Sequence, residues 1–163
     1  MKKRVYIETT IVSYLTARPS RDVVRLAHQQ TTREWWEQHR RKYALCASQF
    51  VLDEAGDGDP DAAAGRLAAL QDVPVLGDSA EVRALAKAFV EHGILPETAA
   101  IDALHLAVAV VHEVDILLTW NCRHLANAAI LGDIGRLARD KGYEMPIVCT
   151  PEELTGDEGS EDD

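Results

Sequence analysis

The chain has 163 residues, a length typical of one domain with its own hydrophobic core. Its composition, 47% hydrophobic and 27% charged, is ordinary for a soluble globular protein. The longest apolar run, Leu106 to Val111, is too short to span a membrane, and no secretory signal is expected after the Lys-Lys-Arg opening. Three cysteines without CxxC spacing indicate reduced thiols, so we predict a cytoplasmic protein.

The net charge of −10 at first argues against a nucleic-acid partner, because phosphate binding depends largely on Lys and Arg. The charge is unevenly distributed, however. Residues 1–42 hold ten basic and four acidic residues, residues 43–151 hold seven and sixteen, and residues 152–163 hold seven acidic residues alone. The first segment is basic enough to meet phosphate, so the net charge does not exclude RNA.

Predicted strands and helices alternate along the chain. Apolar and β-branched runs predict strands at residues 4–7, 43–47, 73–76, 116–119 and 145–149. Capping and periodicity signals predict helices at 20–41, 48–54, 61–71, 79–91, 96–112 and 123–141. Ser20 is the expected N-cap of the first of these helices, and Pro74 places the third strand at an edge of the sheet.

This alternation predicts a three-layer α/β/α domain around a central, mainly parallel sheet of four to five strands. We assign the domain to residues 1–154. The remaining residues, 155–163, contain mainly Gly, Ser, Asp and Glu, and we expect them to be a disordered acidic tail.

Polar side chains follow three of the predicted strands. Glu8 follows the first, Glu54 lies in the helix after the second, and Thr119 and Asn121 follow the fourth. Ligands of an open parallel sheet bind outside the carboxyl ends of its strands, so these side chains are expected at one edge. Taken singly, each has an ordinary reading: Glu8 and Glu54 as solvated carboxylates, and Asn121 as a turn residue.

The helix predicted at 96–112 adds a fourth polar group. Ile101, Leu104, Val108 and Val111 are expected to share its apolar face, while Asp102, His105 and His112 lie on a narrow polar stripe with Ala109. A carboxylate in such apolar surroundings requires solvent, a cation or hydrogen bonds. Asp102 is therefore a site candidate, whereas His105 is more simply read as a packed or half-exposed histidine.

Carboxylates that converge on one edge repel each other unless a cation lies between them. Oxygen ligands without Cys or His pairs indicate Mg²⁺ or Mn²⁺. One or two such ions can activate a water molecule for in-line attack on a phosphodiester. The pattern thus predicts metal-dependent phosphoryl chemistry.

Four segments, taken in order, resemble the acidic motifs of PIN-domain proteins. They are residues 5–15 (VYIETTIVSYL), 50–54 (FVLDE), 101–107 (IDALHLA) and 115–125 (DILLTWNCRHL). The resemblance covers residue 4 to about residue 150, and within the family it is greatest to VapC-type toxins of bacterial toxin–antitoxin pairs.

The resemblance implies a Mg²⁺- or Mn²⁺-dependent endoribonuclease that forms homodimers and is inhibited by a small antitoxin. It assigns the catalytic positions to Glu8, Glu54, Asp102 and Asn121. Glu8 and Asp102 would be the main metal carboxylates, and Glu54 would bind the metal or a metal-bound water. Asn121 would orient a water or ligand, with Thr119 in support.

The basic N-terminal segment suits an RNA substrate. Arg18, Arg21 and Arg25 are candidates to contact the RNA backbone, and an ordinary charged helix face is the alternative. Trp35 and Trp36 could stack on bases, but core or dimer packing by at least one of them is favoured.

Two departures from the family pattern leave an alternative open. Glu8 replaces the usual Asp and is one methylene longer, and Asn121 replaces a usual Asp, which leaves three formal negative charges. The alternative is a catalytically weak or inactive PIN-like module that binds RNA or a partner. A different metal-dependent phosphoryl-transfer enzyme is a third reading, but no P-loop or GxGxxG motif supports its nucleotide-binding versions.

Overall fold

A computed structural model describes residues 1–155, so the predicted acidic tail lies outside the described residues apart from Thr155. Its five-stranded sheet is parallel throughout, with strand order β3-β2-β1-β4-β5. The strands are β1 (Arg4–Ile7), β2 (Ala44–Ser48), β3 (Val75–Leu76), β4 (Ile116–Leu118) and β5 (Ile147–Cys149). The predicted parallel sheet is thus confirmed, and β3 lies at an edge directly after Pro74, as expected.

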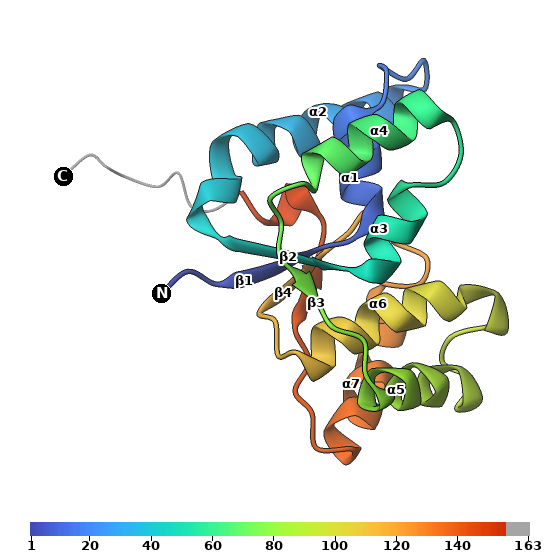
Figure 1. Cartoon of the computed structure of the whole chain (residues 1–163). Coiled ribbons are helices and arrows are strands. Elements are labelled where there is room, and N and C mark those ends of the chain that lie inside the picture. Colours follow the sequence, from blue (N-terminus) through green and yellow to red (C-terminus); the bar gives the residue numbers. More distant parts are fainter. Residues whose placement is uncertain (156–163) are drawn as a thin grey trace.

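Helices cover both faces of the sheet, which gives the predicted three layers (Figure 1). The helices are α1 (Thr9–Thr16), α2 (Val23–Glu34), α3 (Gln49–Ala55), α4 (Pro60–Ala69), α5 (Ala80–Glu91), α6 (Ala100–Val111) and α7 (Ala128–Asp140). Figure 1 shows α1, α2 and α4 above the sheet and α5, α6 and α7 below it, while α3 contacts both α1 and α6. Among residues 1–155, no helix has the length and apolar character needed to cross a membrane.

The two central strands are buried on both faces. Val5, Tyr6 and Ile7 of β1 have no exposed surface, and Leu117 and Leu118 of β4 have none either. Parallel strands covered by helices on both sides read as continuous apolar runs without alternation. Burial on both faces therefore explains why Val5-Tyr6-Ile7 does not alternate between apolar and charged residues.

The helix predicted over residues 20–41 differs from the observed one at both ends. Asp22 caps α2 by accepting a hydrogen bond from the Arg25 backbone N–H at 2.8 Å, so Ser20 is not the N-cap. After α2 the chain continues as a π-helical turn, Trp35–His39, and a 3₁₀ turn, Arg40–Lys42. The prediction of one uninterrupted α-helix to residue 41 was therefore wrong.

The strands that follow β1 in the chain are added on opposite sides of it, β2 and β3 on one side and β4 and β5 on the other. Helices above the sheet connect β1 to β2 on one side, whereas the chain returns by α5 and α6, below the sheet, to place β4 on the other side of β1 (Figure 1). The carboxyl ends of β1 and β4 thus form a topological switch point, where α/β sheets bind their ligands. Here the Glu8 backbone N–H donates to the Leu118 carbonyl at 3.1 Å.

Candidate metal centre

Glu8 is the N-cap residue of α1, and its carboxylate is buried, with 3% of the residue exposed. Its Oε2 accepts three hydrogen bonds: from the Thr10 backbone N–H at 3.0 Å, the Thr10 hydroxyl at 2.5 Å and the Thr119 hydroxyl at 2.8 Å. Burial raises the pKa of Glu8, although the nearby His105 and the hydrogen bonds from the threonines act in the opposite direction. The carboxylate is held rigidly at the switch point.

Glu54 approaches from α3, whose first turn is capped by the Ser48 hydroxyl, as predicted. Its Oε1 accepts a hydrogen bond from the Thr9 hydroxyl at 2.7 Å and lies 2.5 Å from His105 Nε2. Burial alone would raise the pKa of Glu54, but the hydrogen bond and charge interaction with His105 and the bond from Thr9 together lower it. Glu54 is therefore held as a carboxylate.

His105 is fully buried on α6 and is fixed at both ring nitrogens. While Nε2 contacts Glu54, Nδ1 lies 2.7 Å from the Tyr6 hydroxyl, which in turn lies 2.6 Å from the Ser48 hydroxyl. Burial raises the pKa of Tyr6 well above its usual value, so this hydroxyl keeps its proton at neutral pH. These contacts form a series of hydrogen bonds, Ser48–Tyr6–His105–Glu54, that links β2, β1, α6 and α3.

Three side chains converge into one donor cluster. One ligand atom each from Glu8, Glu54 and His105 lies within 4.8 Å of the other two. Two carboxylates and an imidazole fit a divalent cation, because they provide both negative charge and lone pairs at one point. Sequence reasoning named the two glutamates and interpreted His105 as packed or half-exposed; it is packed, but its place in the donor cluster was not predicted. Its position three residues after Asp102 on the polar stripe was the available signal.

Asp102 and Asn121 lie beside this cluster in a second group. Asp102 Oδ2 is 3.0 Å from His124 Nδ1, and the i, i+3 spacing places Asp102 on the same side of α6 as His105. Asn121 Oδ1 accepts a hydrogen bond from the His124 backbone N–H at 2.9 Å, so its side chain shapes the turn after β4. His124 thus orients Asp102, a contact that sequence reasoning did not identify.

Thr119 connects the two groups, and this gives a testable prediction. Its hydroxyl donates to Glu8 and accepts from the Asn121 backbone N–H at 2.9 Å, and the residue is fully buried. Thr119→Val removes this hydroxyl at nearly constant volume, so we expect a loss of about 1–3 kcal/mol in the free energy of unfolding, measured by urea denaturation. Thr119→Ser retains the hydroxyl and should lose less; equal losses in both variants would contradict the prediction.

Comparison with known proteins identifies the architecture. No family model matches the sequence, and no curated protein matches it significantly. In structure, the chain is similar to a chain in the crystal structure of VapBC2 from Rickettsia felis, which is bound to a DNA fragment from the VapBC2 promoter. The TM-score is 0.56 over 90% of this chain and 98% of that chain, with 14% sequence identity. The chain has a PIN-like fold. The expected fold is thereby confirmed.

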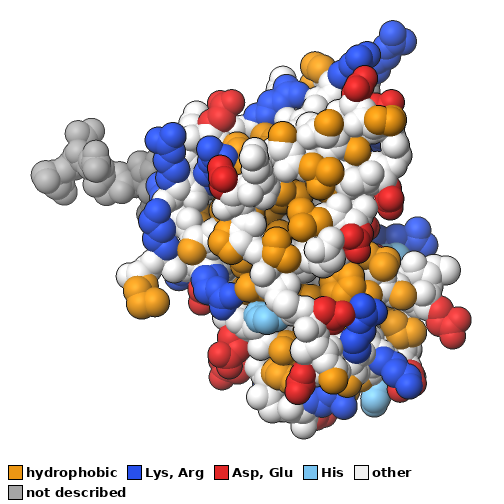
Figure 2. Space-filling view, viewed as in Figure 1, with side chains coloured by type: hydrophobic (Ala, Val, Ile, Leu, Met, Phe, Trp, Pro, Cys, Tyr) orange, Lys and Arg blue, Asp and Glu red, His pale blue; other side chains and the backbone are white. Residues whose placement is uncertain are grey.

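In this PIN-like fold the three candidate RNA-binding arginines are exposed and do not contact the donor cluster. Arg18 and Arg21 lie in the connection between α1 and α2, and Arg25 lies in the first turn of α2. The eight residues of α1 separate this region from Glu8 by about 12 Å along the helix axis. Figure 2 shows basic side chains at the top right of the molecule, where Figure 1 places this connection.

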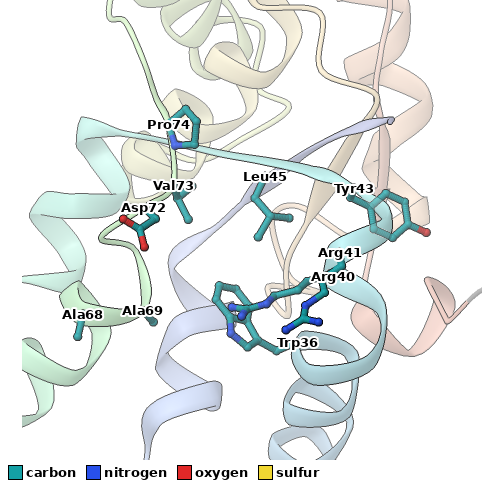
Figure 3. A pocket seen from close by; sticks show the side chains of 10 residues that line it. All are labelled: Trp36, Arg40, Arg41, Tyr43, Leu45, Ala68, Ala69, Asp72, Val73 and Pro74. Atoms are coloured by element: carbon teal, nitrogen blue, oxygen red, sulfur yellow. The ribbon is translucent and has the colours of Figure 1, made fainter. Parts of the chain in front are cut away.

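A basic and aromatic pocket lies at the opposite edge of the PIN-like sheet (Figure 3). It measures about 440 Å³ and is lined by Trp36, Arg40, Arg41, Tyr43, Leu45, Ala68, Ala69, Asp72, Val73 and Pro74. The Arg40 guanidinium carbon lies 4.7 Å from the centre of the Trp36 ring. Tyr43 precedes β2 and Ser48 ends it, so the pocket lies at the amino end of a strand whose carboxyl end is about 16 Å away. Asp72 is the single carboxylate in its lining.

The tandem tryptophans differ in their surroundings. Trp35 is fully buried and stacks on Tyr43 with ring centroids 6.0 Å apart, whereas Trp36 keeps 9% of its surface and lines the pocket. Packing of at least one tryptophan in the core is thus confirmed. Trp35 stacks on Tyr43, which precedes β2, so this ring lies away from the carboxyl ends of the strands, where the donor cluster is.

Proposed function

We propose that this protein is a metal-dependent endoribonuclease that hydrolyses RNA phosphodiester bonds, and that it is the toxin of a toxin–antitoxin pair. The observation that carries the proposal is the convergence of Glu8, Glu54 and His105 at the switch point of a PIN-like fold. When bound there, Mg²⁺ or Mn²⁺ would activate water and neutralise charge on the phosphate. The carboxylates of Glu8 and Glu54 would hold the ion.

The second group would act beside the ion. Asp102 is half-buried and is oriented by His124, so its remaining oxygen lone pairs are available to a metal-bound water. Asn121 fixes the turn that carries His124, and Thr119 fixes both Glu8 and Asn121. Under this proposal Asp102 remains catalytic, while Asn121 and Thr119 position the other groups.

The proposed partners rest on the same fold and on surface charge. RNA would follow the exposed arginines Arg18, Arg21 and Arg25 toward the carboxyl edge of the sheet. The structural neighbour comes from a VapBC2 complex, which supports a small antitoxin as a protein partner. We propose in addition that the toxin forms homodimers and acts in the cytoplasm.

One observation favours a second candidate, an RNA- or partner-binding module without catalysis. The buried carboxylates are already satisfied by protein groups: Glu8 by Thr10 and Thr119, and Glu54 by Thr9 and His105. A site that is complete in hydrogen bonds can fold stably without an ion. RNA cleavage therefore has to be measured directly.

The decisive experiment compares purified protein with its Asp102→Asn variant on structured and unstructured RNA, with Mn²⁺, with Mg²⁺ and with EDTA. We expect cleavage to require the ion and to fall at least about 100-fold in the variant, since even the outer partners of metal ligands contribute 10- to 100-fold. Asp140→Asn is the control, because Asp140 is exposed at the end of α7, and it should leave cleavage unchanged. RNA binding by all three proteins without cleavage would instead establish the binding module.

A further inference from the structure

The donor cluster contains a nitrogen where an all-oxygen magnesium site would have none. His105 has no exposed surface, its Nε2 is directed at Glu54 Oε1, and one of its ring nitrogens lies within 4.8 Å of a Glu8 oxygen. We propose that His105 is a metal ligand through Nε2, and that the site consequently selects Mn²⁺ or a similar transition-metal ion over Mg²⁺. This inference rests on the proposed function in that it places the ion at the same site.

The hydrogen-bond network presents Nε2, rather than Nδ1, to the ion. A histidine that binds metal through one nitrogen usually donates its other ring N–H to a fixed partner, which sets the tautomer and the ring orientation. That partner is the Tyr6 hydroxyl, 2.7 Å from Nδ1. Tyr6 can accept from Nδ1–H and donate its own proton to the Ser48 hydroxyl, 2.6 Å away. In the metal-free protein Nε2–H donates to Glu54, so metal binding through Nε2 requires the imidazole proton to be carried on Nδ1 instead, where the Tyr6 hydroxyl accepts it without moving the side chains of the core.

The separations within the cluster suit shared coordination. Two neighbouring ligands of one ion lie about 3 Å apart, because each ligand is about 2.1 Å from the metal. The 2.5 Å between His105 Nε2 and Glu54 Oε1 is a hydrogen-bond distance and is shorter than this value, so the two atoms must separate before both can bind one ion. A small outward movement of Glu54, which is half-buried on α3, is enough to admit the ion between them.

The chemistry of the donors determines which ion is preferred. Mg²⁺ takes oxygen ligands and gains little from imidazole, whereas imidazole nitrogen suits divalent transition metals. Asn121 does not offset this preference for a transition metal, because its amide carries no negative charge to attract Mg²⁺ and its Oδ1 already accepts a hydrogen bond from the His124 backbone N–H. Two carboxylates and one imidazole therefore favour Mn²⁺, and we expect its Kd to be at least about tenfold lower than that of Mg²⁺.

The test uses Mn²⁺ alone as the probe, since its unpaired electrons report bound nitrogen. Pulsed electron paramagnetic resonance of the Mn²⁺-loaded full chain should show echo modulation from a directly bound ¹⁴N. The modulation should disappear in His105→Gln and persist in His124→Gln, which removes the imidazole paired with Asp102. Absence of ¹⁴N modulation in the Mn²⁺-loaded parent protein, or its loss in His124→Gln alone, would overturn the proposal.

A second variant keeps the proposal testable if the buried His105 substitution prevents folding. Tyr6→Phe retains the ring and removes only the hydroxyl that supports Nδ1. We expect it to weaken Mn²⁺ binding about tenfold while Mg²⁺ binding changes little, with folding checked by circular dichroism. Equal weakening of both ions would contradict the proposed selectivity for Mn²⁺, and no weakening of either would contradict ligation by a His105 that Tyr6 supports.

The measurements separate this inference from the proposed function. Nitrogen modulation without RNA cleavage supports the ligand assignment and rejects the nuclease. Metal-dependent cleavage by a protein whose bound Mn²⁺ shows no nitrogen modulation supports the nuclease and rejects His105 as a ligand.

Discussion

Replacing Glu8 with glutamine is expected to abolish metal-dependent RNA cleavage while making the metal-free protein more stable at neutral pH. The three hydrogen bonds to Glu8 all end on Oε2, so the carbonyl oxygen of a glutamine can accept them in the same place. The variant loses the negative charge, which is costly to bury, and with it the principal attraction for a cation. Function and stability should therefore change in opposite directions.

The raised pKa of Glu8 predicts how the stability difference between Glu8→Gln and the parent protein changes with pH. Burial raises the pKa of Glu8 in the folded state, so between the unfolded and the folded value the native protein binds a proton that the unfolded chain releases. The contribution of Glu8 to stability therefore falls as the pH rises through that window and stays unfavourable above it. Glu8→Gln removes this contribution, so its advantage over the parent protein should grow from acidic to neutral pH.

Thermal unfolding in EDTA measures the expected gain in stability of Glu8→Gln, and RNA cleavage with Mn²⁺ measures its expected loss of activity. We expect cleavage to fall at least about 100-fold and the melting temperature to rise by a few degrees, roughly what 1 kcal/mol produces in a chain of this length. Glu34→Gln, at an exposed position of α2, is the matched control and should change neither quantity. A Glu8→Gln protein that still cleaves RNA at the parent rate would exclude Glu8 as a metal ligand.

Truncation of Leu106 should have the largest effect on stability among the substitutions considered. Leu106 is fully buried on α6, the helix that carries both Asp102 and His105. Leu106→Ala leaves a cavity in the core and should cost about 2–5 kcal/mol. This corresponds to a fall in melting temperature on the order of 10 °C. Calorimetry of the parent and variant proteins measures it.

Ile101 on the same helix provides the matched control. Its side chain keeps 44% of its surface exposed, so Ile101→Ala should cost less than about 1 kcal/mol. Similar costs at the two positions would contradict the burial observed for α6. The comparison also tests a helix face that sequence periodicity assigned incorrectly.

The error on α6 shows where sequence reasoning ends. Periodicity placed Ile101 on the apolar face, whereas the structure leaves 44% of it exposed. His105, expected to be packed or half-exposed, is completely buried. Because α6 packs against α5, α3 and the sheet, most of its circumference is buried and the helical period no longer marks one face. The polar atoms of His105 are satisfied by Tyr6, 99 positions earlier in the chain, and no local pattern reveals such a partner.

Other parts of the site followed from general rules. The alternation of strands and helices predicted the parallel sheet, and the rule that ligands bind at strand carboxyl ends placed Glu8 and Thr119 at one edge. Their hydrogen bond at 2.8 Å agrees with that placement. The hydroxyls of Thr9 and Thr10, which fix the two glutamates, were not identified, because threonines at the start of a helix are common and carry no specific signal.

The position of the centre between β1 and β4 has a consequence for the time at which it forms. Glu8 and Thr119 are 111 positions apart, and the Thr119 backbone N–H is in turn held by the Cys149 carbonyl of β5. Pairing of such distant segments requires closure of a long loop and is slow relative to local helix formation. During synthesis, we expect the donor cluster to remain unassembled until β5 is free to pair with β4. Under the proposed function, a nascent chain without a paired β5 would not yet cleave the RNA around it.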